Sequence, residues 1–397
     1  MRSRNILLLT TCQLISATGS IIVVTLGGII GSRLSENPAL ATLPISVMVI
    51  SLAATTIPAS MLMRAIGRRR SFSLASWSAV AAVLLATQAI SVSSFGWFVV
   101  AAGFFGVNMA FTQQYRYAAA ESVEPQFSAR AISLVLLGAI GGAMLGPEIL
   151  RAGDRFVADV QFVGALLVLA MLYVIQSGLF LLLQPLRGEY KDPHEAPGRP
   201  LREIVRQPVF IVAVLGGTAA YGVMTLIMTA TPLSMHIIDG MPLEQTADVI
   251  RSHVIGMYLP SLFTGFLIER LGVTRLMTIG AMALMSACAI GLHGHSVMHY
   301  TIALLVLGVG WNFLYVGGTS MLTLTYAMTE RFKAQAVNEF SVFGTSATAS
   351  LLAGTVMHLY GWYTLVLVPL PLFLLILGGL YLVRGDSRLR RLSPARG

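Results

Sequence analysis

Charged residues are scarce in this sequence, and their scarcity excludes most classes of soluble protein. Only 11% of the 397 residues are charged, whereas 56% are hydrophobic and the mean hydropathy is +0.78. A soluble globular domain carries about 25% charged residues, because its surface faces water. Cysteine is nearly absent too, and two residues cannot provide the several disulfides of a small secreted scaffold. The composition therefore predicts that the bulk of the chain lies in a lipid bilayer.

Long apolar stretches, separated by short polar loops, make up most of the chain. A helix needs roughly 20 residues to cross the hydrocarbon core of a bilayer, so each stretch is long enough to span it. We identify twelve of them, at 5–31, 39–63, 72–92, 95–117, 131–150, 161–184, 208–235, 248–268, 274–293, 299–327, 335–359 and 362–384. No set of acid, base and nucleophile falls near the middle of a stretch, which disfavours an enzyme. The sequence predicts an all-α membrane protein with twelve transmembrane helices.

The distribution of basic residues indicates how the chain is inserted. If both termini lie on one side, that side holds 22 of the 26 lysine and arginine residues, and the other side holds only Arg33, Arg151, Arg155 and Arg251. Loops rich in these residues stay in the cytoplasm. We therefore expect a multi-pass protein of the bacterial cytoplasmic (inner) membrane with both termini in the cytoplasm. The net charge of +9 then reflects topology, and no nucleic-acid partner is expected.

The chain also repeats itself at an offset of 205 residues. The segment Arg64–Arg70 after the second stretch corresponds to Glu269–Arg275 after the eighth, and Ala129–Ile132 corresponds to Ala334–Val337. Two segments that share one offset indicate two duplicated halves of six helices each. The expected domains are an N-terminal half at 1–184, a cytoplasmic linker rich in proline and charge at 185–207, a C-terminal half at 208–384 and a basic cytoplasmic tail at 385–397.

The whole chain resembles the major facilitator superfamily, whose members carry an acid-arginine signature in the loop after the second helix. In this sequence Ser60 stands at the first glycine position of the signature and Arg64 at the aspartate position, whereas the second-half copy keeps the acid at Glu269. The resemblance implies two pseudo-symmetric six-helix halves, transport by alternating access and a substrate site near the middle of the membrane.

Polar or metal-binding side chains inside the hydrocarbon are costly and therefore point to function. The seventh stretch contains Met224 and Met228, and the eighth contains His253 and Met257. The i, i+4 spacing places both members of each pair on one helix face, one turn apart. At about 1.5 Å per residue from the loop that joins the two helices, Met228 lies level with His253, and Met224 with Met257. Three thioethers and one imidazole are soft or borderline, uncharged donors, and this set suits Cu(I).

The pattern Met-x3-Met followed by His-x3-Met also resembles the CcoA-like branch of the superfamily, whose known members import copper for cytochrome oxidase assembly. The segments Thr229–Leu233 and Pro260–Gly265 are similar to that branch as well. The resemblance implies that the four residues pass copper, as Cu(I), into the cell. Copper is then a transported substrate and not a cofactor, and a copper chaperone is a candidate partner. Cys12 and Cys288 are auxiliary candidates, because importers of this branch also use cysteines.

Two alternatives remain open at this stage. Methionine is also a flexible residue that fills gaps between helices. The CcoA-like branch contains riboflavin transporters too, and Asn108, Trp311 and Asn312 offer amide and aromatic groups to a small organic solute such as riboflavin or a drug. His236 belongs to a group of histidines expected on the outer side, where they would collect copper before it reaches the deeper site. The expected partners are thus the lipid bilayer and either copper or a small molecule.

Replacement of the imidazole tests the copper hypothesis. If the protein imports copper, His253→Ala should reduce copper accumulation severalfold, because the change removes the only nitrogen donor of the proposed set. Uptake of radioactive copper by cells that carry the variant or the unchanged protein measures the effect. Equal accumulation in the two strains would remove the support that His253 gives to copper import.

Overall fold

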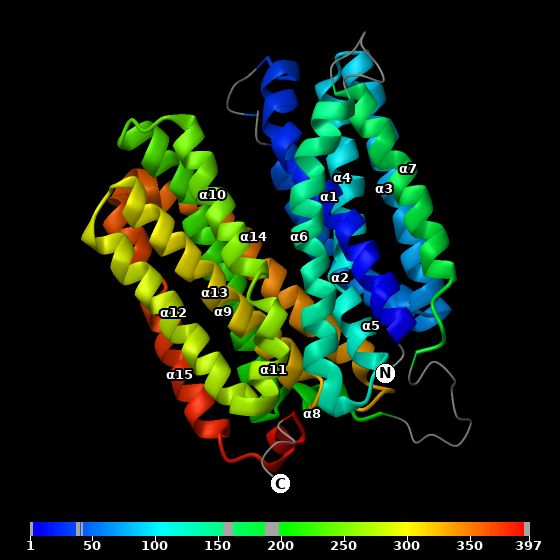
Figure 1. Ribbon diagram of the computed structural model, residues 1–397, viewed down its shortest axis with the longest axis vertical. Helices are drawn as coiled ribbons and strands as arrows, with labels where there is room; N and C mark the ends of the chain where they lie inside the picture. The colour runs from blue at the N-terminus through cyan, green and yellow to red at the C-terminus, as the bar shows by residue number, and fades with distance from the viewer. Residues whose placement is uncertain (1–2, 37–39, 41–42, 154–161, 187–197, 393–397) are drawn as a thin grey trace. The chain divides into compact units, whose positions relative to one another are not determined.

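The computed structural model describes residues 3–36, 40, 43–153, 162–186 and 198–392, and within these residues it contains helices and turns but no β-strand. The all-α prediction is confirmed. Packing divides the chain into two compact units: unit 1 is Met1–Ser122 with Leu134–Lys191, and unit 2 is Val123–Ser133 with Asp192–Gly397. Figure 1 draws the helices of unit 1 from blue to green and most of those of unit 2 from green to red. Residues 187–197 of the predicted linker and 393–397 of the predicted tail lie outside the described residues, and the predicted domain boundaries stay a prediction.

Unit 1 contains the helices of the first six predicted spans. They are α1 (Ser3–Leu34), α2 (Leu43–Ile66), α3 (Arg68–Ser91), α4 (Phe95–Thr112), α5 (Tyr115–Glu121), most of α6 (Ser128–Gly153) and α7 (Val163–Leu181). The fourth predicted span is interrupted between α4 and α5, at Gln113 and Gln114. The first turns of α6, up to Ser133, pack with unit 2. Apolar side chains such as Ile22, Phe105 and Tyr173 form the core of unit 1.

Unit 2 contains the helices of the remaining predicted spans. These helices are α9 (Pro208–Pro232), α10 (Leu243–Tyr258), α11 (Ser261–Leu271), α12 (Val273–His293), α13 (Val297–Leu322), α14 (Arg331–Leu367) and α15 (Leu370–Val383). The unit also contains the short elements η2 (Pro125–Phe127), α8 (Leu201–Val205), the π-helical turn η3 (Leu233–Ile238) and η4 (Ser387–Leu392). The eighth predicted span is divided at Leu259 and Pro260, because proline has no N–H to donate within the helix. The tenth predicted span ends early, since α13 stops at Leu322.

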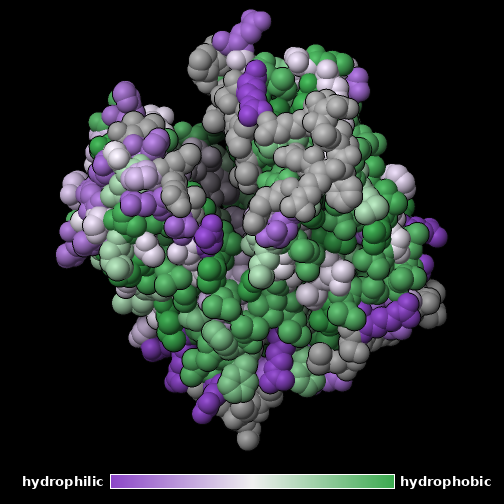
Figure 2. All heavy atoms as spheres, turned by 45° about the horizontal axis from the view of Figure 1, so that its top comes forward, coloured by the Kyte–Doolittle hydropathy of each residue, from purple (hydrophilic) through white to green (hydrophobic). Residues whose placement is uncertain are grey.

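The helices have the length and surface of membrane spans. In the described part of the chain, 11 helical segments are long and apolar enough to cross a membrane. The last of them, Arg331–Val383, contains two predicted spans, which are separated where Gly361 (φ 77°) interrupts α14. Large apolar side chains, among them Leu262, Leu374 and Leu382, remain exposed. Figure 2 shows hydrophobic residues over much of the face that it draws, as expected for a surface covered by acyl chains.

Two turns occupy equivalent places in the sequence repeat. Gly67 joins α2 to α3, and Gly272, 205 residues later, joins α11 to α12. Both have a positive φ, 82° and 90° respectively. Glycine adopts this conformation without the steric cost that a side chain would add. The signature loop therefore contains the same glycine turn in both copies of the repeat.

Ion pairs, one of them buried, join the helix ends next to these turns. In unit 1, where Arg64 replaces the acid of the signature, the neighbouring Arg68 makes a two-bonded pair with Glu121 of α5, with N···O distances of 2.8 and 2.7 Å. Both side chains are almost fully buried, at 1% and 3% exposed. In unit 2, Glu269 pairs with Arg130. A buried charge is costly unless it is paired, so Arg68 and Glu121 hold α3 and α5 together, whereas Arg130 is 43% exposed and its pair is the weaker constraint.

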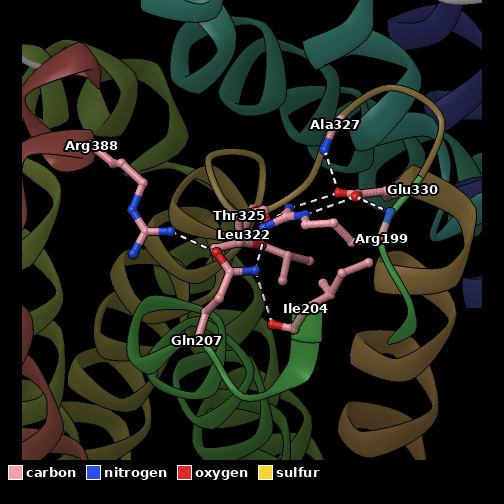
Figure 3. Close-up of polar contacts among 8 residues, drawn as sticks. All are labelled: Arg199, Ile204, Gln207, Leu322, Thr325, Ala327, Glu330 and Arg388. Carbon is pink, nitrogen blue, oxygen red and sulfur yellow. Dashed lines mark hydrogen bonds and ion pairs between the residues drawn. The ribbon is translucent and has the colours of Figure 1, made fainter. Parts of the chain in front are cut away.

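A polar cluster in unit 2 ties the end of the predicted linker to other segments (Figure 3). Arg199 donates from its backbone nitrogen and Nε to Glu330 Oε1, at 2.7 and 2.8 Å, and from Nη2 to Oε2 at 2.7 Å. Gln207 donates to the carbonyl oxygen of Thr325 at 2.8 Å and accepts from Arg388 at 2.6 Å. The network thus joins the linker end, the turn between α13 and α14, and the segment after α15.

The Arg199–Glu330 pair makes a prediction about pH. Hydrogen bonds from Arg199 lower the pKa of Glu330 to about 2, whereas an unfolded glutamate titrates near 4.3. The pair therefore stabilises fully above about pH 4.3, and its contribution is lost as the pH falls from there through about 2. We expect Glu330→Gln to lower the melting temperature of the purified protein at pH 7, and this difference from the unchanged protein to shrink only below about pH 4.3. Glu203→Gln, which changes an exposed acid of α8, is the control. An equal fall in melting temperature in both variants would contradict the assignment.

Candidate functional site

His253 and Met257 lie on the face of α10 that packs against α13. His253 is 1% exposed and Met257 is buried. The two helices approach very closely there, since a Cβ at Gly256 would lie 2.5 Å from the carbonyl oxygen of Leu305, and one at Gly308 would lie 2.6 Å from that of His253. The structure thus turns both residues of the predicted His-x3-Met pair toward α13.

One ring nitrogen of His253 has a hydrogen-bond partner, and the other has none among the described residues. Nδ1 lies 2.8 Å from the carbonyl oxygen of Leu304. A carbonyl can only accept, so Nδ1 carries the proton and donates, and Nε2 keeps its lone pair. Nε2 is buried and has no hydrogen-bond partner among the described residues. An imidazole in this state is able to bind a metal or to accept a hydrogen bond.

Met224 and Met228 lie on α9, which packs along α13 and α14. Both are half-buried. They continue the helix face of Tyr221, because offsets of three and seven residues return to the same side of a helix. Among the described residues, no group of three or more His, Cys, Asp or Glu side chains is arranged to hold a metal ion. Convergence of the two methionines with His253 and Met257 on one metal therefore stays a prediction.

The auxiliary candidates have different surroundings. Cys12 on α1 of unit 1 and Cys288 on α12 of unit 2 are buried free thiols. His236 is exposed, and its Nδ1 lies 2.8 Å from the carbonyl oxygen of Met241. Asn108 is buried and donates to the carbonyl oxygen of Ala75 at 2.9 Å, while its Oδ1 has no partner among the described residues.

Asn312, a further auxiliary candidate, forms hydrogen bonds at the break between α10 and α11. Its Nδ2 donates to the carbonyl oxygen of Met257 and to Ser261 Oγ, both at 2.7 Å. Its Oδ1 accepts from Thr264 Oγ1 at 2.6 Å. The side chain thereby bonds to polar groups on both sides of the break at Leu259 and Pro260. The geometry favours a structural role for this amide.

Unit 2 contains an aromatic cluster, defined here as Tyr221, Tyr258, Trp311, Tyr315 and Phe343. Trp311 and Tyr315 of α13 are stacked, with ring centroids 4.8 Å apart. Tyr221 of α9 makes edge-to-face contacts with Trp311, Tyr315 and Phe343 at 5.0 to 5.4 Å, and Tyr258 at the end of α10 contacts Trp311 at 5.7 Å.

The aromatic cluster combines three fully buried rings with two that are half-buried, Tyr221 and Tyr258. Nε1 of Trp311 is buried without a hydrogen-bond partner among the described residues. Trp311 was predicted as a site residue from the sequence, whereas Tyr221, Tyr258 and Phe343 were not. Tyr221 had one signal, its place one turn before Met224 in an apolar helix. The cluster offers a planar, polarisable surface and, at Trp311 Nε1, a donor without a partner among the described residues, which suits an aromatic ring that carries a carbonyl group.

Unit 2 also has an open groove of about 510 Å³ along α9, α14 and the start of α15. Its lining is mostly apolar, with the hydroxyls of Ser341, Thr345 and Thr348 and no charged residue. Phe340, Leu352 and Val368 in this lining are exposed apolar side chains. A surface of this kind suits acyl chains of the bilayer better than a polar solute.

A substitution separates the structural role of Asn312 from a role in substrate binding. We expect Asn312→Ala to destabilise the protein by about 1–3 kcal/mol, because it leaves buried polar groups at the helix break unsatisfied. The melting temperature of the purified protein measures this loss. Asn108→Ala removes one hydrogen bond and provides a comparison in unit 1. A stable Asn312→Ala protein with weakened substrate affinity would instead make Asn312 a binding residue.

Comparisons with known proteins agree with this architecture. The profile of the Major Facilitator Superfamily matches residues 9–247. The protein named riboflavin transporter RfnT from Brucella anthropi is 38% identical, over 94% of this chain and 94% of its own. An uncharacterized transporter of the same superfamily from Bacillus subtilis, YdeG, is 25% identical over 94% of this chain and 90% of its own.

Solved structures share the fold at low sequence identity. The transporter FucP in its outward conformation matches with a TM-score of 0.78 at 14% identity, over 95% of this chain and 98% of that one. The prediction of the superfamily fold is confirmed, and none of these proteins is described as a copper importer. The chain belongs to the major facilitator superfamily, a family of transporters.

Proposed function

We propose that this protein is a secondary transporter of a small, planar organic solute, with riboflavin as the first candidate. The observation that carries the proposal is the 38% identity to the Brucella anthropi riboflavin transporter along nearly the whole of both chains. The sequence has no candidate catalytic residues near the middle of a span.

The aromatic cluster gives the proposal physical support. Tyr221 and Trp311 lie near the middle of α9 and α13, the depth at which transporters of this organisation bind their substrates. The cluster contains no charged residue, so it favours an uncharged ring over an ion. The isoalloxazine ring of riboflavin is planar, uncharged near neutral pH and bears carbonyl groups. Stacking on tyrosine and tryptophan would recognise such a ring.

Copper import is the second candidate, and one observation favours it. The buried Nε2 of His253 keeps a lone pair with no partner among the described residues, as a metal ligand would before it binds. Met257 lies one turn along the same helix, and Met224 and Met228 complete the predicted soft donor set. A copper chaperone would be the partner of such a transporter. The resemblance to a riboflavin transporter favours the organic solute over copper.

The orientation in the membrane forms part of the proposal. We propose that the chain lies in a bacterial inner membrane with both termini in the cytoplasm. The support is the distribution of basic residues, of which only Arg33, Arg151, Arg155 and Arg251 fall on the other side.

Uptake of both substrates by the same membrane vesicles tests the proposal. Vesicles that contain the protein should accumulate labelled riboflavin above the level of vesicles without it, and an excess of unlabelled riboflavin should suppress that uptake. Radioactive copper should reach equal levels in both preparations. Accumulation of copper without accumulation of riboflavin would contradict the proposal and support copper import.

A further inference from the structure

We infer that the aromatic cluster of unit 2 is the site that holds the ring of the transported solute, with Trp311 Nε1 as the donor to a ring carbonyl and Tyr221 and Tyr258 as the stacking surfaces. The inference rests on the proposed function, because it takes an uncharged heteroaromatic ring as the cargo. It assigns a separate task to each of the three residues.

The indole nitrogen of Trp311 is the strongest indication of a ligand. The side chain is 0% exposed, and its N–H has no partner among the described residues. Trp362, the other buried tryptophan of unit 2, shows the usual arrangement, since its Nε1 donates to the carbonyl oxygen of Gly291 at 2.8 Å. A buried donor without an acceptor is unfavourable and rare. We therefore assign the acceptor to the solute, whose carbonyl oxygen supplies it in the bound state.

The exposure of the rings determines how the solute reaches this donor. Trp311, Tyr315 and Phe343 are buried, whereas Tyr221 and Tyr258 are half-buried and each contacts Trp311 edge to face. The solute ring thus meets the two tyrosines first. In the proposed bound state one of these tyrosine side chains would rotate away from the indole, and its phenol ring would stack on the solute.

The residues next to the aromatic cluster indicate which class of solute it can hold. Met224 continues the face of Tyr221 by one turn, and a thioether adapts to the edge of an aromatic ring. Asn312, next to Trp311 in the chain, is occupied by three hydrogen bonds within the protein. The buried Trp311 Nε1, which has no partner among the described residues, is therefore assigned the hydrogen bond that selects solutes with a carbonyl acceptor on the ring.

The test uses the full-length purified protein, riboflavin and its intrinsic fluorescence, which is quenched when the isoalloxazine ring stacks on tyrosine or tryptophan. The variants are Trp311→Phe, which keeps an aromatic ring and removes the N–H, and Tyr221→Leu, which removes a stacking surface. Trp362→Phe is the matched control, because it removes a buried indole N–H of the same unit that is already satisfied by Gly291.

We expect Trp311→Phe to weaken riboflavin binding about 3- to 10-fold, the effect of one hydrogen bond, with quenching retained at saturation. Tyr221→Leu should weaken binding about tenfold and reduce the quenching at saturation. Trp362→Phe should lower the melting temperature and leave the Kd unchanged. The unchanged Kd of Trp362→Phe separates a binding role of Trp311 from a loss of packing, because a loss of packing would affect both tryptophan variants alike.

Two results would overturn the inference. If the unchanged protein binds riboflavin, and Trp311→Phe and Tyr221→Leu bind it with the same Kd and the same quenching, the ring is held elsewhere and the proposed function stands. If the unchanged protein neither binds nor transports riboflavin, the proposed substrate and the site assignment fall together.

Discussion

Polar groups inside the hydrocarbon region must find partners within the protein, and the structure depends on this constraint. Most buried polar side chains obey it. Gln176 of α7 accepts from Ser16 and donates to Ser76 and Tyr115. Asn312 satisfies the carbonyl oxygen of Met257 at the broken helix. Trp311 Nε1, near the middle of α13, is one of the buried groups that have no partner among the described residues.

Close packing around α13 makes the aromatic cluster possible. The helix contacts α9, α10 and α12. A Cβ at Gly318 would lie 2.8 Å from the carbonyl oxygen of Ala213 on α9, and one at Gly308 would lie 2.6 Å from that of His253 on α10. Small residues of this kind let transmembrane helices approach closely. Rings from α9 and α10 consequently contact Trp311, and both ring placement and helix packing follow from the same glycines.

Hydropathy was sufficient to predict the all-helical class and the spans, because a bilayer imposes one length and one composition on each span. The two-half superfamily fold was predicted from the sequence repeat and the signature loop. It did not show the breaks at Gln113–Gln114 and Leu259–Pro260, since the apolar signal runs through them. The i, i+4 spacing correctly placed His253 and Met257 on one helix face, but spacing does not say which neighbour that face meets, and the structure shows that it meets α13. The aromatic cluster takes residues from four helices, so no local period in the sequence reveals it. Trp311 was predicted because aromatic and amide side chains within spans can line a cavity for an organic solute, whereas the contacts of Tyr221 and Tyr258 with Trp311 became visible only with tertiary packing.

Nuclear magnetic resonance of the tryptophan indole groups tests the central claim most directly. The chain contains four tryptophans, so labelling with nitrogen-15 gives four indole N–H signals, and the Trp311→Phe spectrum identifies one of them. Saturating riboflavin should move the Trp311 proton signal downfield, as a new hydrogen bond to a carbonyl requires, and leave the Trp362 signal in place. Binding of riboflavin with no movement of the Trp311 signal would contradict the account.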